Sequence, residues 1–250
     1  MAFHKVIIML RKVLLFLCLI SFSINISLFG SQKVYIIHGY GSSAVFMGKI
    51  NRALRSEGFK TVKFRYRSVH DDLNMLGLQL FNIIKESNDD TISFVTHSMG
   101  ALVLRSMYQY LDTSCTIPTI FRIVMLAPPN KGAEIADQFS SGKLSSLIFG
   151  PNLAYMKTDS DSYANKLPLP ISCEVGVIIG VRGKKKGYNP FIKGDNDGDL
   201  SPQREILGIE KDIVFVKSSH AAMTHSKKVI SFIQNFLMDG TFHSMNFQLN

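Results

Sequence analysis

A serine at the end of an apolar run is the first residue of this sequence whose surroundings suit covalent chemistry. Ser98 lies in "FVTHSMGALV", residues 94–103, with Thr96 two residues before it and Gly100 two residues after it. A serine hydroxyl attacks a carbonyl carbon poorly unless a base accepts its proton and the main chain holds it forward. A tight turn from a strand into a helix meets the second condition, commonly with glycine at both flanking positions. The alternative is a serine that only caps the following helix.

The segment "GDNDGDLSP", residues 194–202, offers an acid for such a serine. It contains three aspartates, of which we favour Asp197, then Asp199, then Asp195. Alternating acidic residues can also bind calcium, but the EF-hand requires a glycine and a glutamate at fixed positions that this segment does not provide. The spacing therefore excludes an EF-hand and leaves a looser ion site open.

The segment "SSHAAMTH", residues 218–225, offers a base. We expect His220 in the loop between the last strand and the last helix, where its ring can reach Ser98. A neutral imidazole there would accept the serine proton and return it to the leaving group, while the aspartate fixes its tautomer. We expect His225 inside the last helix as a solvated residue, and His97 as a packed neighbour of the serine.

A glycine-rich turn follows the first expected strand, in "VYIIHGYGSS", residues 34–43. Glycines at this point let the chain bend so that a main-chain N–H faces the oxyanion of an acyl-transfer reaction. The N–H groups of Tyr40 and Met99 would then flank the substrate carbonyl. The alternative, a phosphate-binding loop, lacks the third glycine of the dinucleotide pattern and the lysine of a P-loop.

Short apolar runs alternate with stretches of helical period, which predicts an α/β protein with a mostly parallel sheet. The expected strands cover residues 34–37, 62–66, 92–95, 123–127, 175–179 and 213–216. Five of them are almost continuously apolar, as central strands covered on both faces are. The run "VKFRY", residues 62–66, alternates apolar and basic residues, so we expect it at a sheet edge. Helices are expected between the strands, including about 99–111 and a last one over about 223–237.

Several of these stretches together resemble a known family. They are "VYIIHGYG", "FVTHSMG", "RIVMLAPPNKGAE", "NDGDLS" and "SSHAAMTHSKKVISFIQNFL". They are similar to bacterial α/β-hydrolase-fold proteins of the lipase and esterase type, in which a segment of the "LAPPN-G" kind follows the strand after the nucleophile helix. The resemblance covers about residues 32–240 and implies an α/β-hydrolase fold, with a mostly parallel central sheet and helices on both faces. It also implies no cofactor, a triad of Ser98, Asp197 and His220, and oxyanion donors at Tyr40 and Met99.

Two residues depart from the pattern of that family. Thr96 replaces the commoner glycine, and Asp199 stands where many relatives have a β-branched residue. The resemblance implies a hydrolase of carboxylic esters that works through an acyl-enzyme. Acyl transfer to an alcohol other than water would use the same triad, and a non-catalytic ligand-binding module on the same fold is the alternative from another class.

Residues 130–170 lack a clear period, which predicts a small lid-like insertion over the carboxyl edge of the sheet. Its apolar side chains could line an acyl-binding wall, which would suit a lipid substrate, or only pack over the sheet edge. These side chains are Phe139, Leu144, Leu147, Ile148, Phe149, Leu153 and Met156.

Residues 1–31 have the order of a targeting segment, with basic residues before an apolar stretch and small residues after it. We expect a signal peptide or an N-terminal membrane anchor there, with Cys18 as part of it, and one hydrolase domain over residues 32–250. The protein would then be periplasmic, secreted or tethered to the membrane. In an oxidising compartment, Cys115 and Cys173 could form one disulfide, or they could be two buried thiols.

The chain of 250 residues carries 28 Lys and Arg against 19 Asp and Glu, a formal net charge of +9. Such an excess can indicate a nucleic acid or an anionic lipid surface as the partner. The only dense basic run, residues 184–186, lies beside glycines, and no basic motif with interleaved aromatic residues typical of nucleic-acid binding is present. We expect an ester or lipid substrate, no nucleic-acid partner, no metal, and a membrane surface as an open alternative.

Overall fold

A single parallel sheet organises the protein. The computed structural model describes residue 11 and residues 32–112, 116–140 and 149–243. Within them, the six strands lie in the order β2-β1-β3-β4-β5-β6, and every neighbouring pair is parallel. The strands are β1 (Lys33–Ile37), β2 (Lys60–Phe64), β3 (Thr91–His97), β4 (Thr119–Leu126), β5 (Glu174–Val181) and β6 (Asp212–Lys217). The α/β architecture predicted from alternating apolar runs is confirmed.

The strand at each edge of the sheet differs from the inner strands in burial. The prediction that the "VKFRY" run forms an edge strand is confirmed, because β1 is the one strand that pairs with β2 in the described part of the chain. The apolar pattern of β6 predicts a central strand, and this is wrong. β6 is the other edge, and Phe215 on its outer face is 53% exposed. The buried side chains of both edge strands, Phe64 of β2 and Val214 and Val216 of β6, still pack on the core.

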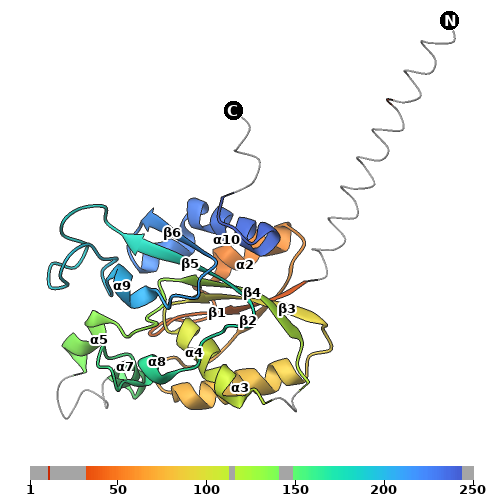
Figure 1. The fold of residues 1–250 in the computed structure, drawn as a ribbon, viewed down its shortest axis with the longest axis horizontal. Helices are drawn as coiled ribbons and strands as arrows, with labels where there is room; N and C mark the ends of the chain where they lie inside the picture. Colours follow the sequence, from red (N-terminus) through yellow and green to blue (C-terminus); the bar gives the residue numbers. More distant parts are fainter. Residues whose placement is uncertain (1–10, 12–31, 113–115, 141–148, 244–250) are drawn as a thin grey trace, which may run out of the picture.

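Helices cover both faces of the sheet (Figure 1). They are α2 (Gly48–Ser56) and α10 (Lys227–Asp239) on one face, and α3 (Leu73–Lys85) and α4 (Gly100–Met107) on the other. Because strand side chains alternate between faces, Val34 and Ile36 of β1 pack toward α2 and α10, while Tyr35 and Ile37 pack toward α3 and α4. Two apolar clusters therefore sandwich the sheet and hold its strands in register.

Two helices end or begin differently from the sequence prediction. The helix after Ser98 ends at Met107 and continues as the 3-10 turn η1 (Tyr108–Tyr110). The last predicted helix is divided into the 3-10 turn η2 (Ala221–His225) and α10, because the Ser226 hydroxyl accepts from the Val229 N–H and caps a new helix start. His225 is therefore exposed on η2 rather than inside the last helix.

In the described part of residues 130–170, where the sequence predicts an insertion, there are three short helices, α5 (Glu134–Phe139), α7 (Asn152–Tyr155) and α8 (Tyr163–Lys166). A fourth short helix, α9 (Pro202–Glu205), follows the aspartate segment. Several residues named in the sequence analysis lie outside the described residues. They are Leu144, Leu147, Ile148, Cys18, Cys115 and the predicted leader apart from Arg11. Across the described ranges, no helix is long and apolar enough to cross a membrane. In the same ranges Cys173 is a free thiol, whose Sγ donates to the Pro170 carbonyl over 3.4 Å.

Candidate active site

Ser98 lies at a strained turn between β3 and α4. Its φ is +52°, one of two positive values among the described non-glycine residues, and such a conformation costs about 1–3 kcal/mol unless its surroundings impose it. Here the Ser98 N–H donates to the Leu126 carbonyl of β4 over 2.9 Å. A Cβ built on Gly100 would lie 2.6 Å from the Ile37 carbonyl oxygen, so only glycine lets α4 begin this close to β1. The turn forms with the buried Thr96 at the other flank.

His220 and Asp197 form a buried pair beneath the pocket. The Nδ1 of His220 lies 2.6 Å from Oδ2 of Asp197, and the aspartate has no solvent exposure. The other oxygen, Oδ1, accepts the main-chain N–H groups of Asp199 and Leu200 over 3.0 and 3.1 Å. These contacts fix the carboxylate against one nitrogen of the ring and leave Nε2 for chemistry, which is the arrangement of the acid and base in a serine triad.

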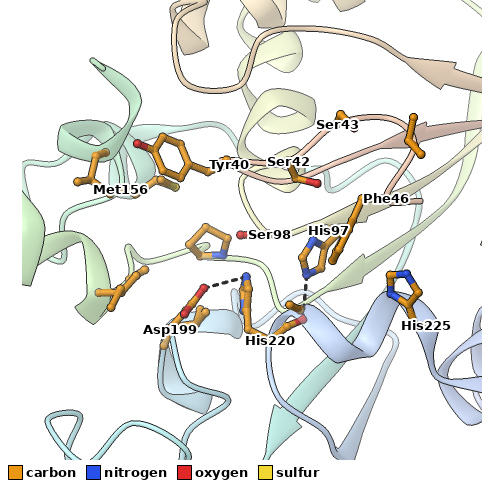
Figure 2. Close-up of a pocket in the computed structure, with 18 residues that line it drawn as sticks. Tyr40, Ser42, Ser43, Phe46, His97, Ser98, Met156, Asp199, His220 and His225 are labelled. Atoms are coloured by element: carbon orange, nitrogen blue, oxygen red, sulfur yellow. Dashed lines mark hydrogen bonds and ion pairs between the residues drawn. The ribbon is translucent and has the colours of Figure 1, made fainter. Parts of the chain in front are cut away.

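Asp199 faces the other nitrogen of the same ring. Its Oδ2 lies 3.5 Å from Nε2 of His220, and its side chain is 43% exposed (Figure 2). Burial alone would lower the pKa of His220, but the charge and hydrogen bond of Asp197 and the charge of Asp199 raise this pKa to about 9. Burial raises the pKa of Asp199, the positive charge of His220 lowers it and the charge of Asp197 raises it, with a net upward shift. The two candidate acids thus occupy opposite nitrogens of one imidazole.

His97 supports the loop that carries His220. Its Nε2 lies 3.1 Å from the His220 carbonyl oxygen, and the two ring centroids are 4.9 Å apart. Burial, followed by the charge of His220, lowers the pKa of His97 to about 3. His97 is therefore a neutral, packed ring next to Ser98 in the chain, and its Nε2 donates to the main-chain carbonyl of His220.

The glycine-rich turn after β1 approaches Ser98 closely. A Cβ on Gly39 would lie 2.8 Å from the Ser98 Cβ, so the turn fits only with glycine there. The next N–H in the chain belongs to Tyr40, and the N–H after the serine belongs to Met99. Within the described residues, neither N–H donates to a protein acceptor. Both predicted oxyanion donors therefore lie close to Ser98 and have no protein acceptor among the described residues.

A pocket of about 760 Å³ opens over these residues. Figure 2 shows Ser98 in its middle, with Tyr40 and Met156 to one side and Phe46 and His225 to the other. The side toward the insertion is apolar and includes Ala133, Ile135, Leu153 and Met156. The opposite side mixes polar and aromatic groups: Ser42, Ser43, Phe46 and His225. The pocket therefore has an apolar half and a more polar half that meet at Ser98.

Residues 130–170, where the sequence predicts an insertion, contribute to the pocket wall and to the core at once. Leu153 and Met156 are buried and line the pocket. Phe139 is 48% exposed and packs against Phe149 with ring centroids 5.7 Å apart. The Tyr40 hydroxyl donates to the Phe149 carbonyl over 2.5 Å, which ties the glycine-rich turn to the insertion.

Several residues at the site were not predicted from the sequence. Phe46 and His225 contact each other edge to face at 4.9 Å on the polar side of the pocket. Glu205 lies fully buried behind the site, and in the described part of the chain neither of its carboxyl oxygens has a hydrogen-bond partner. Burial, then the charges of Asp197 and Glu134, raise its pKa well above the usual value. A second histidine five residues after His220 was the available signal for His225, whereas nothing local in the sequence indicates a buried Glu205.

Asp195, the third candidate acid, lies away from His220. Its carboxylate accepts the N–H groups of Arg182, Gly183 and Lys184 over 2.8–3.3 Å, so it holds the loop after β5. Among the described residues, no group of three or more His, Cys, Asp or Glu side chains could hold a metal ion.

No protein-family model matches the chain, and no curated protein matches its sequence. Solved structures do match it. The mature form of the lipase BlEst2 from Bacillus licheniformis is 16% identical, with a TM-score of 0.60, over 85% of this chain and 93% of that one. A metagenomic carboxyl esterase, MGS0156, is 16% identical with a TM-score of 0.59, over 78% of this chain and 66% of that one.

A third match is the type II thioesterase BorB of the borrelidin biosynthetic cluster, 12% identical with a TM-score of 0.54, over 83% of this chain and 93% of that one. Identities this low establish a shared architecture. Together with the six-stranded parallel sheet, they identify the fold as the α/β-hydrolase fold that the sequence motifs predicted.

Proposed function

We propose that this protein is a serine hydrolase of carboxylic esters that acts through an acyl-enzyme. One observation carries the proposal: Ser98 at a positive-φ turn shares a pocket with His220, whose Nδ1 is held by the buried Asp197. The structural similarity to a lipase, an esterase and a thioesterase supports the same class of chemistry.

In the proposed reaction, Nε2 of His220 takes the proton of Ser98 while the serine oxygen bonds to the ester carbonyl carbon. The N–H groups of Tyr40 and Met99 stabilise the oxyanion. The His220 imidazolium then gives its proton to the departing alcohol, and the acyl group remains on Ser98. A water molecule, deprotonated by His220, releases the acid and restores the serine.

We further propose that the acyl chain lies on the apolar side of the pocket, beside Ile135, Leu153 and Met156, and the alcohol on the side of Phe46 and His225. A pocket of about 760 Å³ has room for a medium acyl chain. A lipid ester is the substrate class that this division of polarity fits best.

The test is the hydrolysis of p-nitrophenyl esters of increasing acyl length by the wild-type protein and by Ser98→Ala. We expect Ser98→Ala to lose at least ~10⁴-fold in kcat. Ser43→Ala is the matched control, since Ser43 is an exposed serine in the same pocket, and it should retain activity. Hydrolysis that survives in Ser98→Ala would refute the proposed nucleophile. Adding alcohol acceptors to the same assay separates hydrolysis from acyl transfer.

We also propose that residues 1–31 direct the protein out of the cytoplasm, with residues 32–250 as its single hydrolase domain. The basic and apolar order of this segment supports the proposal. Mass spectrometry of the protein from fractionated cells would test it. An intact N-terminus in the cytoplasmic fraction would contradict it.

A further inference from the structure

A basic loop projects from the sheet next to the candidate active site. It comprises residues 182–193, between β5 and Asp197, and in Figure 1 it extends past the carboxyl end of β5. Ser98 and His220 also follow the carboxyl ends of their strands. The basic loop and the pocket therefore belong to the same edge of the molecule.

The basic loop is held firmly at its base. Asp195 accepts three main-chain N–H groups from its first residues. The Asn196 amide donates to the carbonyls of Asn189, Ile192 and Gly194 over 3.0–3.3 Å. Ile192 is buried. A polar network and an apolar anchor thus fix the shape of a loop whose basic side chains are exposed.

The exposed side chains of the basic loop combine positive charge with aromatic rings. Five basic residues, Arg182, Lys184, Lys185, Lys186 and Lys193, are all exposed, and residues 182–193 contain no acidic residue. Phe191 is 85% exposed and Tyr188 is 44% exposed. One loop therefore exposes both positive charge and aromatic rings.

The outer face of the edge strand β6 extends this surface. A Cβ on Gly183 would lie 2.9 Å from Cε of Lys217, so the Lys217 side chain lies against the start of the basic loop. Phe215, two residues earlier on the same strand face, is 53% exposed. The surface therefore offers a sixth cation and a third ring.

We propose that the basic loop docks the protein on an anionic lipid bilayer, with the lysines at the phosphate groups and Phe191 in the interfacial layer. A bilayer satisfies both properties of the surface, because it presents negative charge beside an apolar interior. Single-stranded nucleic acids are bound along grooves with successive stacking rings, whereas these residues lie on a protruding loop. The docking does not depend on the proposed hydrolase activity.

Docking through this loop would bring the mouth of the pocket to the lipid surface. Val45 lines the pocket and is 79% exposed, so it would add an apolar side chain to the face that meets the bilayer. A bilayer-held enzyme would receive an apolar substrate without passing it through water.

The sequence contains no tryptophan, so Phe191→Trp gives a fluorophore at one known position. In the full-length chain, this variant is titrated with phosphatidylcholine vesicles that contain phosphatidylglycerol or lack it. We expect a blue shift and quenching by brominated lipid only with phosphatidylglycerol. Phe121→Trp is the positional control, because Phe121 lies near the amino end of β4, at the end of the strands opposite to the one that the basic loop follows. Its emission should not respond.

The charge requirement is tested in the Phe191→Trp background. Replacing Lys184, Lys185 and Lys186 with Gln should weaken partitioning about fivefold per residue, or roughly 100-fold in total. The matched control replaces Lys49, Arg52 and Arg55, exposed on α2, with Gln, which changes the net charge equally. This control should lose far less.

Three results would overturn the proposal. The first is an unchanged Phe191→Trp spectrum with phosphatidylglycerol vesicles in a protein that still melts cooperatively. The second is an equal loss of vesicle partitioning in the α2 control. The third is binding to single-stranded RNA without binding to vesicles. The last result would assign the surface to nucleic acid. None of these measurements requires hydrolysis, so they are independent of whether Ser98 is a nucleophile.

Discussion

The Asp199 carboxylate lies 3.5 Å from Nε2 of His220, the nitrogen that the proposed reaction uses to deprotonate Ser98. An imidazolium held between Asp197 and Asp199 is stabilised at both nitrogens, which agrees with the pKa of His220 being raised to about 9. Protonated His220 cannot act as a base, so Asp199 opposes the first proton transfer at neutral pH. It would also stabilise the imidazolium once that transfer has occurred.

This geometry predicts an alkaline activity profile. His220 must lose its proton before it can act, so kcat/KM should rise with pH to a midpoint near 9 in the free enzyme. Asp199→Asn removes one of the charges that raise this pKa, and the midpoint should move down by about one unit. A pH series of kcat/KM with a soluble ester measures both. An unchanged midpoint in Asp199→Asn would show that the contact has no influence on the base.

Asp197 should matter far more than Asp199 for the rate itself. Its carboxylate holds Nδ1 of His220 from a fully buried position, and an amide there would favour the wrong tautomer, at a cost of about 10⁴-fold in kcat. Asp197→Asn and Asp199→Asn form a matched pair for this comparison, assayed at one pH above 9. Should Asp199→Asn lose more activity than Asp197→Asn, the assignment of the acid would have to be reversed.

Gly39 should be essential for rate although it carries no side chain. Its substitution by Ala would place Cβ 2.8 Å from the Ser98 Cβ and push the Tyr40 N–H away from the oxyanion. We expect a fall of about 10²–10³-fold in kcat, as when an oxyanion donor is removed. Gly41→Ala is the control, because a Cβ there meets nothing within 4 Å although φ is +62°. Comparable losses of activity in the two variants would point to strain in the turn rather than to the oxyanion contact.

Much of this architecture could be predicted from local sequence, because apolar runs and a serine turn leave local signals. The position of β6 at an edge could not, since strand order depends on which strands meet after folding. The same holds for Arg105 on α4, which is almost fully buried and donates to the carbonyls of Asn130, Leu167 and Pro168. The contact of Asp199 with Nε2 of His220 also joins segments distant in sequence. The sequence pattern could therefore identify Asp199 as a candidate acid, but it could not show that Asp199 faces Nε2.

Glu205 should make the protein less stable as the pH rises. Its carboxyl is buried without a hydrogen-bond partner in the described residues, and this burial raises its pKa in the folded state well above the ordinary value of 4.5 for a glutamate. Between these two pKa values the unfolded chain has lost the proton that the folded protein keeps. The folded state then loses about 1.4 kcal/mol of stability per pH unit.

Glu205→Gln keeps the size and removes the titration. This variant should unfold at a higher Tm than the wild type at pH 8, with the difference shrinking toward pH 4. Thermal melts across this range measure the effect. Glu210→Gln is the control, because this glutamate lies nearer the surface, where its carboxylate accepts the main-chain N–H groups of Leu207 and Gly208. A Tm difference for Glu205→Gln that does not depend on pH would contradict the buried, protonated carboxyl.

The central claim, that Ser98 is a nucleophile activated by His220, is tested most directly with a fluorophosphonate probe and mass spectrometry of the labelled peptide. We predict labelling on Ser98 in the wild-type protein, none there in Ser98→Ala, and at least a ~10³-fold slower reaction in His220→Ala. His225→Ala, which changes the other histidine on the pocket wall, should label at nearly the wild-type rate. A folded wild-type protein that stays unlabelled, or that is labelled on a different serine, would contradict the account.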